Sequence, residues 1–165
     1  MQVSHHKDTG APPIPPPLIV LGATITGVII DRLVGAKRSP SPFLRIIGYA
    51  VSILGGSLMT SAAFAMLRSG NSPDPRTPVQ RLNQGGVFRW SRNPIYLGML
   101  LNQLGVGLVR RSLATVGLVP VTLALLVQKV IAGEETYLAS RFGDEYAQYC
   151  EQVPRWFRGI GSRAS

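Results

Sequence analysis

The sequence is poor in the residues from which most catalytic centres are built. Its 165 residues include one cysteine, Cys150, and two histidines, His5 and His6, which lie together in a polar N-terminal segment. A single cysteine excludes an internal disulfide framework and a zinc site made of several cysteines. Because both histidines lie near the N-terminus, the body of the chain has no histidine for a Ser-His-Asp triad or a histidine metal site.

Charged residues are also scarce, and they avoid long stretches of the chain. Only 15% of the residues are charged, against about 25% in an ordinary soluble domain, and the mean hydropathy is +0.20. So apolar a chain is not intrinsically disordered. Its net charge of +9 comes from 17 Lys and Arg against 8 Asp and Glu, but the low overall charge is not typical of a nucleic-acid binder.

Four apolar stretches are long enough to be considered as membrane spans. A membrane-spanning helix needs roughly 20 mostly apolar residues, with about 17 as the lower limit. We therefore predict an all-α integral membrane bundle of about four transmembrane helices, at residues 17–34, 44–67, 94–109 and 112–132. Only Arg110 and Arg111 separate the last two, which predicts a tight helical hairpin. The alternative is a soluble helical bundle, but its helices would show a charged face at every turn.

The distribution of basic residues predicts an orientation in the membrane. With four spans, 11 of the Lys and Arg residues fall on the side that holds both termini and the loop at 68–92, and 6 fall on the other side. The positive-inside rule then predicts that both termini and this loop are cytoplasmic. The proline-rich start and the lack of a small-residue cleavage site favour a retained anchor over a cleaved signal peptide.

The loop at 68–92 is the first of two polar segments with a recognisable pattern. Its first half contains Pro73, Pro75 and Pro78. It then turns at Gly85-Gly86 and continues into the sequence RNPIYLG at residues 92–98. Pro94 suits the first turn of a helix, and Asn93 stands at the position of the helix cap. Free backbone amides at this helix start can face an anion. The simpler interpretation is a loop followed by a well-capped helix.

The C-terminal segment is the second, and it holds five of the eight acidic residues. Glu134 and Glu135 directly follow an apolar stretch, where one buried charge costs roughly 3 kcal/mol on insertion scales. Such a pair usually has a cationic partner, from the protein or from a ligand. We predict an interfacial helix beyond the pair, with Gly143 as its weak point and with one apolar face that comprises Leu138, Phe142, Tyr146, Tyr149 and Val153.

Together these segments resemble one family. The resemblance rests on the motif GGVFRWSRNPIYLG, the apolar hairpin after it, and the motif EETYLASRFGDEYAQYCEQVPRWF. Each is weak alone, but their order and spacing over residues 80–157 are similar to those of the integral membrane methyltransferases that include isoprenylcysteine carboxyl methyltransferase and the phospholipid N-methyltransferases. The resemblance implies S-adenosylmethionine as cofactor, bound at the cytoplasmic face, with a lipid membrane and a lipophilic acceptor as partners.

The resemblance also implies an organisation for the chain and a set of site residues. Residues 1–165 form a single membrane domain, which divides into a polar proline-rich N-terminus, two spans, a methyltransferase-like region and a basic tail, at 1–16, 17–67, 68–157 and 158–165. The family's catalytic positions fall on Arg92 and Glu134. Its cofactor-binding positions fall on Leu82, Asn83, Gly86, Phe88, Arg92, Asn93, Pro94, Ile95, Tyr96, Gly98, Glu134 and Glu135.

The chemistry of these residues suits a sulfonium donor. Glu134 or Glu135 can pair with its cationic part, and Arg92 or the helix start can meet its carboxylate. The rings of Phe88 and Tyr96 can pack against the adenine or the sulfonium. In-line methyl transfer needs alignment and a dry site more than acid–base residues, so the shortage of histidine and cysteine is no obstacle.

Two positions depart from the family's pattern and leave the acceptor open. Asn93 stands where many members have a histidine, and an amide carries no proton at neutral pH. Val130 stands where prenylcysteine methyltransferases tend to have an arginine for the substrate carboxylate, so the neighbouring Lys129 is the candidate substrate residue. The acceptor is then an isoprenylcysteine-type carboxylate or similar, or a phospholipid or other lipid amine. A reductase-related membrane protein and a non-catalytic protein with the same fold are the remaining alternatives.

Overall fold

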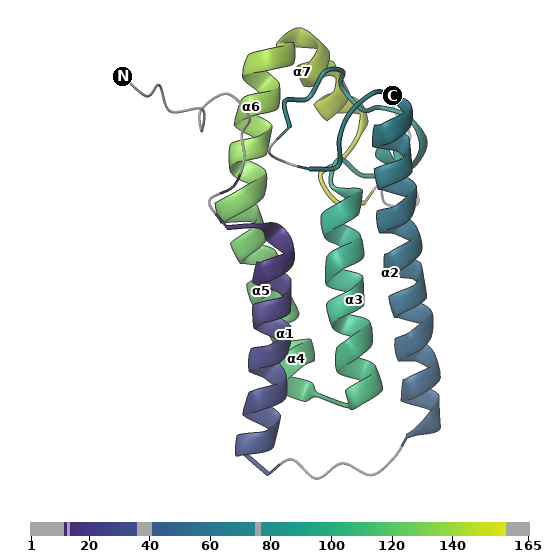
Figure 1. Ribbon diagram of the computed structural model, residues 1–165, viewed down its shortest axis with the longest axis vertical. Helices are drawn as coiled ribbons and strands as arrows, with labels where there is room; N and C mark the ends of the chain where they lie inside the picture. The colour runs from purple at the N-terminus through teal and green to yellow at the C-terminus, as the bar shows by residue number, and fades with distance from the viewer. Residues whose placement is uncertain (1–11, 13, 36–40, 75–76, 158–165) are drawn as a thin grey trace.

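Long helical rods that run side by side make up the body of the molecule (Figure 1). The computed structural model describes residue 12 and residues 14–35, 41–74 and 77–157, and within these ranges it contains helices and no strand. Three rods are α1 (Pro16–Leu33), α2 (Pro42–Arg68) and α3 (Pro94–Arg110). The fourth is a continuous helix over Leu113–Phe142, made of α4 (Leu113–Gly117), α5 (Val119–Leu126), a π-helical turn (Val127–Ile131) and α6 (Ala132–Phe142).

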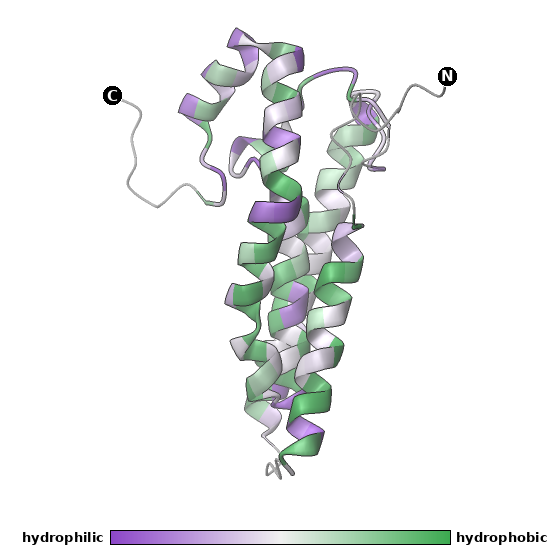
Figure 2. Cartoon of the chain, turned by 90° about the vertical axis from the view of Figure 1, so that its left-hand side faces the viewer, coloured by the Kyte–Doolittle hydropathy of each residue, from purple (hydrophilic) through white to green (hydrophobic). Residues whose placement is uncertain are grey.

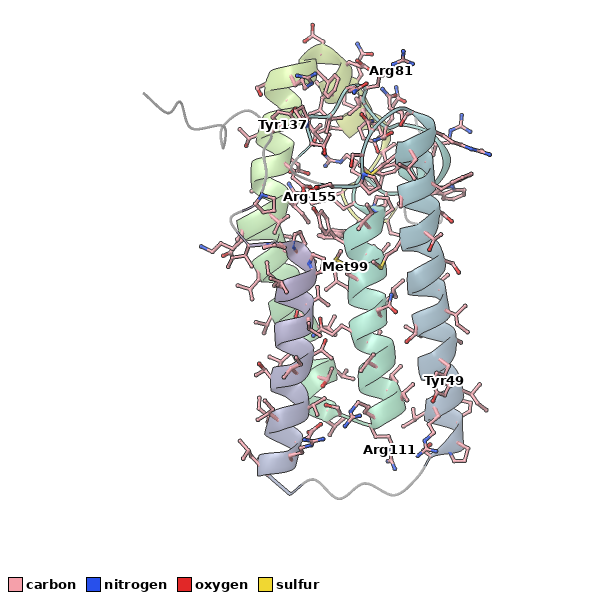
Figure 3. All side chains as sticks on the ribbon, viewed as in Figure 1. Tyr49, Arg81, Met99, Arg111, Tyr137 and Arg155 are labelled. Atoms are coloured by element: carbon pink, nitrogen blue, oxygen red, sulfur yellow. The ribbon has the colours of Figure 1, made fainter. Side chains whose placement is uncertain are left out.

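Two short elements lie outside these rods. A 3₁₀ turn, η1 (Gly86–Arg89), precedes α3, and α7 (Asp144–Gln152) follows α6. Both lie at the end of the bundle where α2 ends and α3 begins (Figure 1). The opposite end holds the connection between α3 and α4, near Arg111 and Tyr49 (Figure 3).

Prolines and glycines fix where the rods begin and end. Pro16, Pro42 and Pro94 each occupy the first turn of a helix, where the missing N–H costs no hydrogen bond. Gly35 and Gly70 follow α1 and α2 with φ angles of +62° and +80°, the left-handed conformation that commonly ends a helix.

The rods have the surface of a membrane protein. Three of them, α1, α2 and Leu113–Phe142, are long and apolar enough to cross a membrane. The remaining rod, α3, has 17 residues, which is about the lower limit for a span. It is more buried than the other three rods. Figure 2 shows hydrophobic residues along the rods and hydrophilic ones gathered at the end that carries α7. Large apolar side chains such as Ile53, 69% exposed, point outward, so the predicted all-α membrane bundle is confirmed.

Glycines bring α2 and α3 into close contact. A Cβ atom added at Gly98 would lie 2.6 Å from the carbonyl oxygen of Gly55, and one added at Gly105 would lie 2.6 Å from that of Gly48. Such approach of two backbones is typical of helices that associate in lipid, where small residues allow van der Waals packing. The contact holds the start of α3, and with it the RNPIYLG motif, against the end of α2.

The hairpin between the third and fourth rods forms as the sequence predicts. Arg111 ends α3 in the left-handed conformation, with φ +54°. Ser112 then caps α4, because its Oγ accepts a hydrogen bond of 3.0 Å from the backbone N–H of Thr115. The two helices therefore reverse direction within two residues.

The helix that holds the fourth predicted span is longer than that span. The span was expected to end at residue 132, but the helix continues to Phe142 and carries Glu134 and Glu135 within it. It breaks only at Gly143, where φ is +50°, so α7 alone forms the terminal helix. The predicted apolar face is therefore divided between α6 and α7. Its residues still pack together in one cluster, which includes Leu138, Phe142, Tyr146, Tyr149 and Val153.

Candidate functional site

The two polar segments singled out in the sequence interlock at one end of the bundle. The phenolic O–H of Tyr149 in α7 donates a buried hydrogen bond of 2.7 Å to the carbonyl oxygen of Phe88 in η1. The backbone N–H of Arg92 donates to the carbonyl oxygen of Pro154 at 3.1 Å. Residues about 60 positions apart in the chain thus form one cap over the start of α3.

Removing the buried phenol tests how much this interlock stabilises the protein. We expect Tyr149→Phe to lower the free energy of unfolding by about 1–3 kcal/mol, because the buried carbonyl of Phe88 loses its donor. Burial raises the pKa of Tyr149 above its ordinary value, so the donor is present throughout the neutral range. Thermal unfolding in detergent measures the effect. Tyr49→Phe, an exposed phenol at the opposite end, is the control, and equal melting temperatures for both variants would contradict the prediction.

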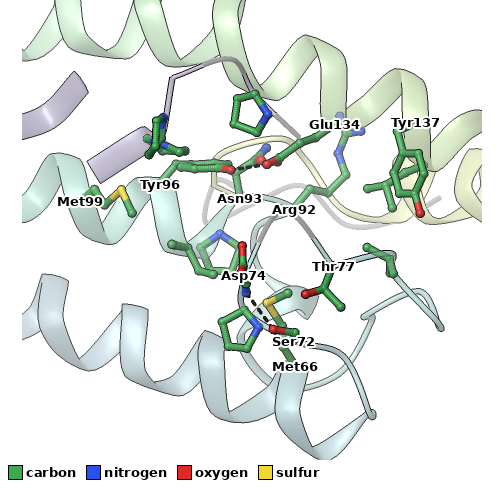
Figure 4. Close-up of a pocket in the computed structure, with 18 of the residues that line it drawn as sticks. Met66, Ser72, Asp74, Thr77, Arg92, Asn93, Tyr96, Met99, Glu134 and Tyr137 are labelled. Carbon is green, nitrogen blue, oxygen red and sulfur yellow. Dashed lines mark hydrogen bonds between the residues drawn. The ribbon is translucent and has the colours of Figure 1, made fainter. Parts of the chain in front are cut away.

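A cavity of about 400 Å³ lies at the same end of the bundle, and it is lined by Phe88 and Arg92 of this cap (Figure 4). Its walls come from the start of α1, the loop after α2, the first turns of α3, and α6. Most of the lining is apolar, and the polar side chains lie in a few places. The lining residues include Pro15, Pro16, Pro17, Ser72, Asp74, Thr77, Phe88, Arg92, Asn93, Ile95, Tyr96, Met99, Glu134 and Tyr137.

One carboxylate belongs to the cavity wall. Glu134 extends from α6, and its Oε1 accepts a hydrogen bond from the phenol of Tyr96 in the first turn of α3 (Figure 4). The Tyr96 side chain is 8% exposed and packs in the main apolar cluster with Met99. Since Tyr96 occupies one carboxylate oxygen, the second oxygen is the one that remains for a ligand.

The neighbouring carboxylate has a different environment. Glu135 accepts two hydrogen bonds from the guanidinium of Arg155, at 3.0 Å and 2.5 Å, and lies 3.3 Å from Nη1 of Arg92. The hydrogen bonds to Glu135 raise the pKa of Arg155, which stays charged. Glu135 is not among the residues that line the cavity. Its contacts join the C-terminal segment to the start of α3.

Two buried polar atoms on the cavity wall have no hydrogen-bond partner within the described residues. They are Nε of Arg92 and the hydroxyl oxygen of Tyr137. Buried donors without partners cost roughly 1–3 kcal/mol each, and native proteins rarely leave them so. Arg92 and Tyr137 are thus two lining residues whose side chains each keep an unpaired polar atom.

Seven of the predicted cofactor-binding residues line this cavity. They are Phe88, Arg92, Asn93, Pro94, Ile95, Tyr96 and Glu134. Asn93 differs from expectation in one respect, since it stands at the first position before α3 but its side chain does not cap the helix. Its amide instead donates to the carbonyl oxygen of Arg155 at 3.2 Å. The predicted cap position of Asn93 is confirmed, but its side chain makes no capping hydrogen bond and its amide nitrogen is held by the C-terminal segment.

The other predicted site residues lie elsewhere, and their roles in cofactor binding stay predictions. Gly98 packs against α2, and Glu135 binds arginines. Lys129, the candidate substrate residue, is exposed in the π-helical turn, whereas Val130 is 1% exposed in the core. A second hollow beside α2 is lined by Leu82, Asn83 and Gly86.

Some cavity residues were missed by sequence reasoning. Tyr137 lies three positions after Glu134, on the same helix face, so a helical reading of this segment would have found it. The prolines that begin α1, and Asp74 in the loop after α2, give no such signal. The packing of α1 against the third and fourth rods brings the prolines to the cavity, and the path of the loop after α2 brings Asp74 there.

A family model decides the relationship that these motifs suggested. The model of phospholipid methyltransferases matches residues 43–145, from the start of α2 to the start of α7. The chain belongs to this family. The match includes α2, which the motifs themselves did not cover, and the cavity walls formed by α3 and α6 fall within it.

Individual relatives are similar over most of the chain. The cobalt-zinc-cadmium resistance protein CzcN of Cupriavidus metallidurans is 30% identical over 81% of this chain and 59% of its own length. The protein-S-isoprenylcysteine O-methyltransferase of Schizosaccharomyces pombe is 29% identical over 78% of this chain and 58% of its own length. An uncharacterized protein of Haemophilus influenzae is 44% identical over 63 residues. The chain thus spans less than two thirds of the first two relatives, and no solved structure matches it.

Proposed function

We propose that the chain is an S-adenosylmethionine-dependent membrane methyltransferase that transfers a methyl group to a lipophilic acceptor in the cavity lined by Arg92, Tyr96 and Glu134. The observation that carries this proposal is one mostly apolar cavity lined by the carboxylate of Glu134 together with Arg92 and Tyr137, whose side chains each keep a polar atom without a partner among the described residues. Membership of the phospholipid methyltransferase family supports it.

The residues present fit this cofactor. Oε2 of Glu134 suits its ammonium or sulfonium group, and Nε of Arg92 suits its carboxylate. The ring of Phe88 lies in the same cavity and offers a face for the adenine. When bound, the cofactor supplies a methyl group on a sulfonium, whose carbon–sulfur bond breaks as the acceptor's nucleophile bonds to the methyl carbon. The chain's part is to orient the two molecules and to exclude water with its proline and methionine walls.

Cofactor binding is the first test. We expect S-adenosylhomocysteine, titrated calorimetrically into detergent-purified protein, to bind and to raise its melting temperature. Stabilisation by a reduced nicotinamide dinucleotide, and not by S-adenosylhomocysteine, would transfer the assignment to a reductase-related protein. If neither ligand changes the melting temperature of a folded sample, the chain is a non-catalytic member of the family.

The charges of the cavity favour a lipid amine as a second candidate acceptor, beside a carboxylate of the isoprenylcysteine type. Asp74 and Glu134 are acidic lining residues, whereas Arg92 already contacts Glu135 through Nη1. Lys129 is exposed and is not among the lining residues. A carboxylate acceptor would therefore enter without a cation of its own, whereas an amine would enter a cavity whose lining includes Asp74 in addition to the Glu134 assigned to the cofactor.

The stability of the product separates the two acceptors. Protein in vesicles is supplied with methyl-labelled S-adenosylmethionine and either phosphatidylethanolamine or an S-prenylated N-acetylcysteine. We expect label in the amine lipid as an alkali-stable N-methyl group. Label released as methanol by alkali from the prenylated cysteine would identify a methyl ester and overturn the amine candidate while supporting the methyltransferase.

A further inference from the structure

A second hollow of about 560 Å³ lies between the last two turns of α2 and the loop at 82–87. It shares no lining residue with the cavity described above. Val87 lines the hollow and Phe88, the next residue, lines the cavity, so the turn η1 separates the two. Leu82, Asn83 and Gly86, which the resemblance assigned to the cofactor, line this hollow instead of the cavity that holds Glu134. We call it the α2 groove.

One wall of the α2 groove is a single face of α2. Ser61, Phe64, Ala65 and Arg68 line it, at spacings that place them on one side of a helix. From Ser61 to Arg68 the groove extends roughly 10 Å along the helix axis. Its lower part, at Ser61, Phe64 and Ala65, carries no charge and belongs to a helix long and apolar enough to span a membrane. Its upper part, at the end of that helix, carries a charge.

The upper part of the α2 groove offers hydrogen-bond donors. The guanidinium of Arg68 lies 4.3 Å from the ring centre of Phe64, and no carboxylate pairs with it in the parts of the chain that the structure describes. Asn83 faces it from the loop and accepts a hydrogen bond from the hydroxyl of Ser69 through Oδ1. Its amide nitrogen has no protein acceptor among the described residues.

We propose that the α2 groove binds one anionic glycerophospholipid of the surrounding bilayer. The phosphodiester lies at Arg68 and Asn83, and one acyl chain follows Phe64, Ala65 and Ser61 toward the membrane interior. A stacked guanidinium with free N–H groups matches phosphate oxygens in geometry and charge. An occupant that reaches both the end of a span and its apolar side chains must itself be amphipathic. The proposal does not depend on the methyltransferase activity.

Lipid binding by native mass spectrometry of the detergent-solubilised full chain tests the proposal. The probes are phosphatidylglycerol, phosphatidylcholine with the same acyl chains, and glycerol 3-phosphate. We expect Arg68→Gln to raise the dissociation constant of the first phosphatidylglycerol about fivefold, the effect of one arginine near an anionic headgroup, and to leave phosphatidylcholine unchanged. Arg89→Gln is the matched control, because Arg89 is exposed in η1 and does not line the groove.

A second variant tests the acyl-chain part of the groove without changing charge. Ser61 is exposed, so Ser61→Leu fills the lower end of the groove without disturbing the helix, and we expect it to weaken the binding of phosphatidylglycerol. Equal losses of affinity for phosphatidylglycerol in Arg68→Gln and Arg89→Gln would show only a general attraction of the basic protein to anionic lipid, and this would overturn the site. Unchanged binding in Ser61→Leu, or glycerol 3-phosphate binding as tightly as the lipid, would overturn the phospholipid assignment.

Discussion

Glu134→Gln is expected to weaken the binding of S-adenosylhomocysteine by about tenfold to a hundredfold, with little change in melting temperature. A hydrogen bond to a charged group contributes about 1.5–3 kcal/mol, and the substitution removes the one carboxylate that both lines the cavity and bonds to Tyr96. Glutamine still accepts the Tyr96 hydrogen bond, so the packing of α3 against α6 persists. Calorimetry on the wild type and the variant gives the ratio of dissociation constants.

Comparison of the two cofactor forms locates the contact further. A larger loss for S-adenosylmethionine than for S-adenosylhomocysteine would place Glu134 at the sulfonium, and equal losses would place it at the ammonium. Glu145→Gln is the matched control, since Glu145 accepts a hydrogen bond from Gln84 and is not among the residues that line the cavity. For Glu135→Gln we expect a lower melting temperature and a smaller loss of affinity, because Glu135 is held by arginines. Unchanged affinity of Glu134→Gln for both ligands would remove this residue from the site.

Gly105→Ala is expected to cost about 1–3 kcal/mol of stability or more, the range for forcing extra atoms into a packed interface. The added Cβ would lie 2.6 Å from the carbonyl oxygen of Gly48 and 2.9 Å from the backbone nitrogen of Ser52. Both are backbone atoms of α2 and cannot turn away, so the two helices must separate. Melting temperature and the monodisperse fraction after detergent extraction measure the loss.

Gly56→Ala is the control for this substitution. Gly56 lies in α2, and a Cβ atom there would have open space around it, so the change should leave stability equal or raise it slightly by reducing backbone freedom. The separation of the helices also moves the start of α3, so we expect Gly105→Ala to weaken cofactor binding from a distance. Equal melting temperatures for the two alanine variants would show that α2 and α3 do not need their close contact.

Glu134 and Glu135 show the limit of prediction in the site. The family resemblance assigned both to the cofactor, whereas the residues alone predicted only a cationic partner from the protein or from a ligand. Adjacent residues on a helix point about 100° apart, so one faces the cavity and the other faces Arg92 and Arg155. Which acid takes which direction depends on how the fourth rod is rotated against α3, and no local pattern encodes that rotation.

The sequence by itself determined the membrane bundle and the motif that starts α3. Charge-free stretches, prolines at helix starts and the arginines of the hairpin act locally, through the cost of burying charge in lipid and through backbone geometry. The sequence also predicted Gly143 as the weak point of the C-terminal helix, and only the tertiary structure decided that the fourth rod continues without interruption from the apolar stretch to Phe142. The tertiary structure also decided that the prolines of α1 line the cavity and that Leu82, Asn83 and Gly86 face the α2 groove. Those features arise from contacts between segments far apart in the chain, whose energies exist only once the rods have packed.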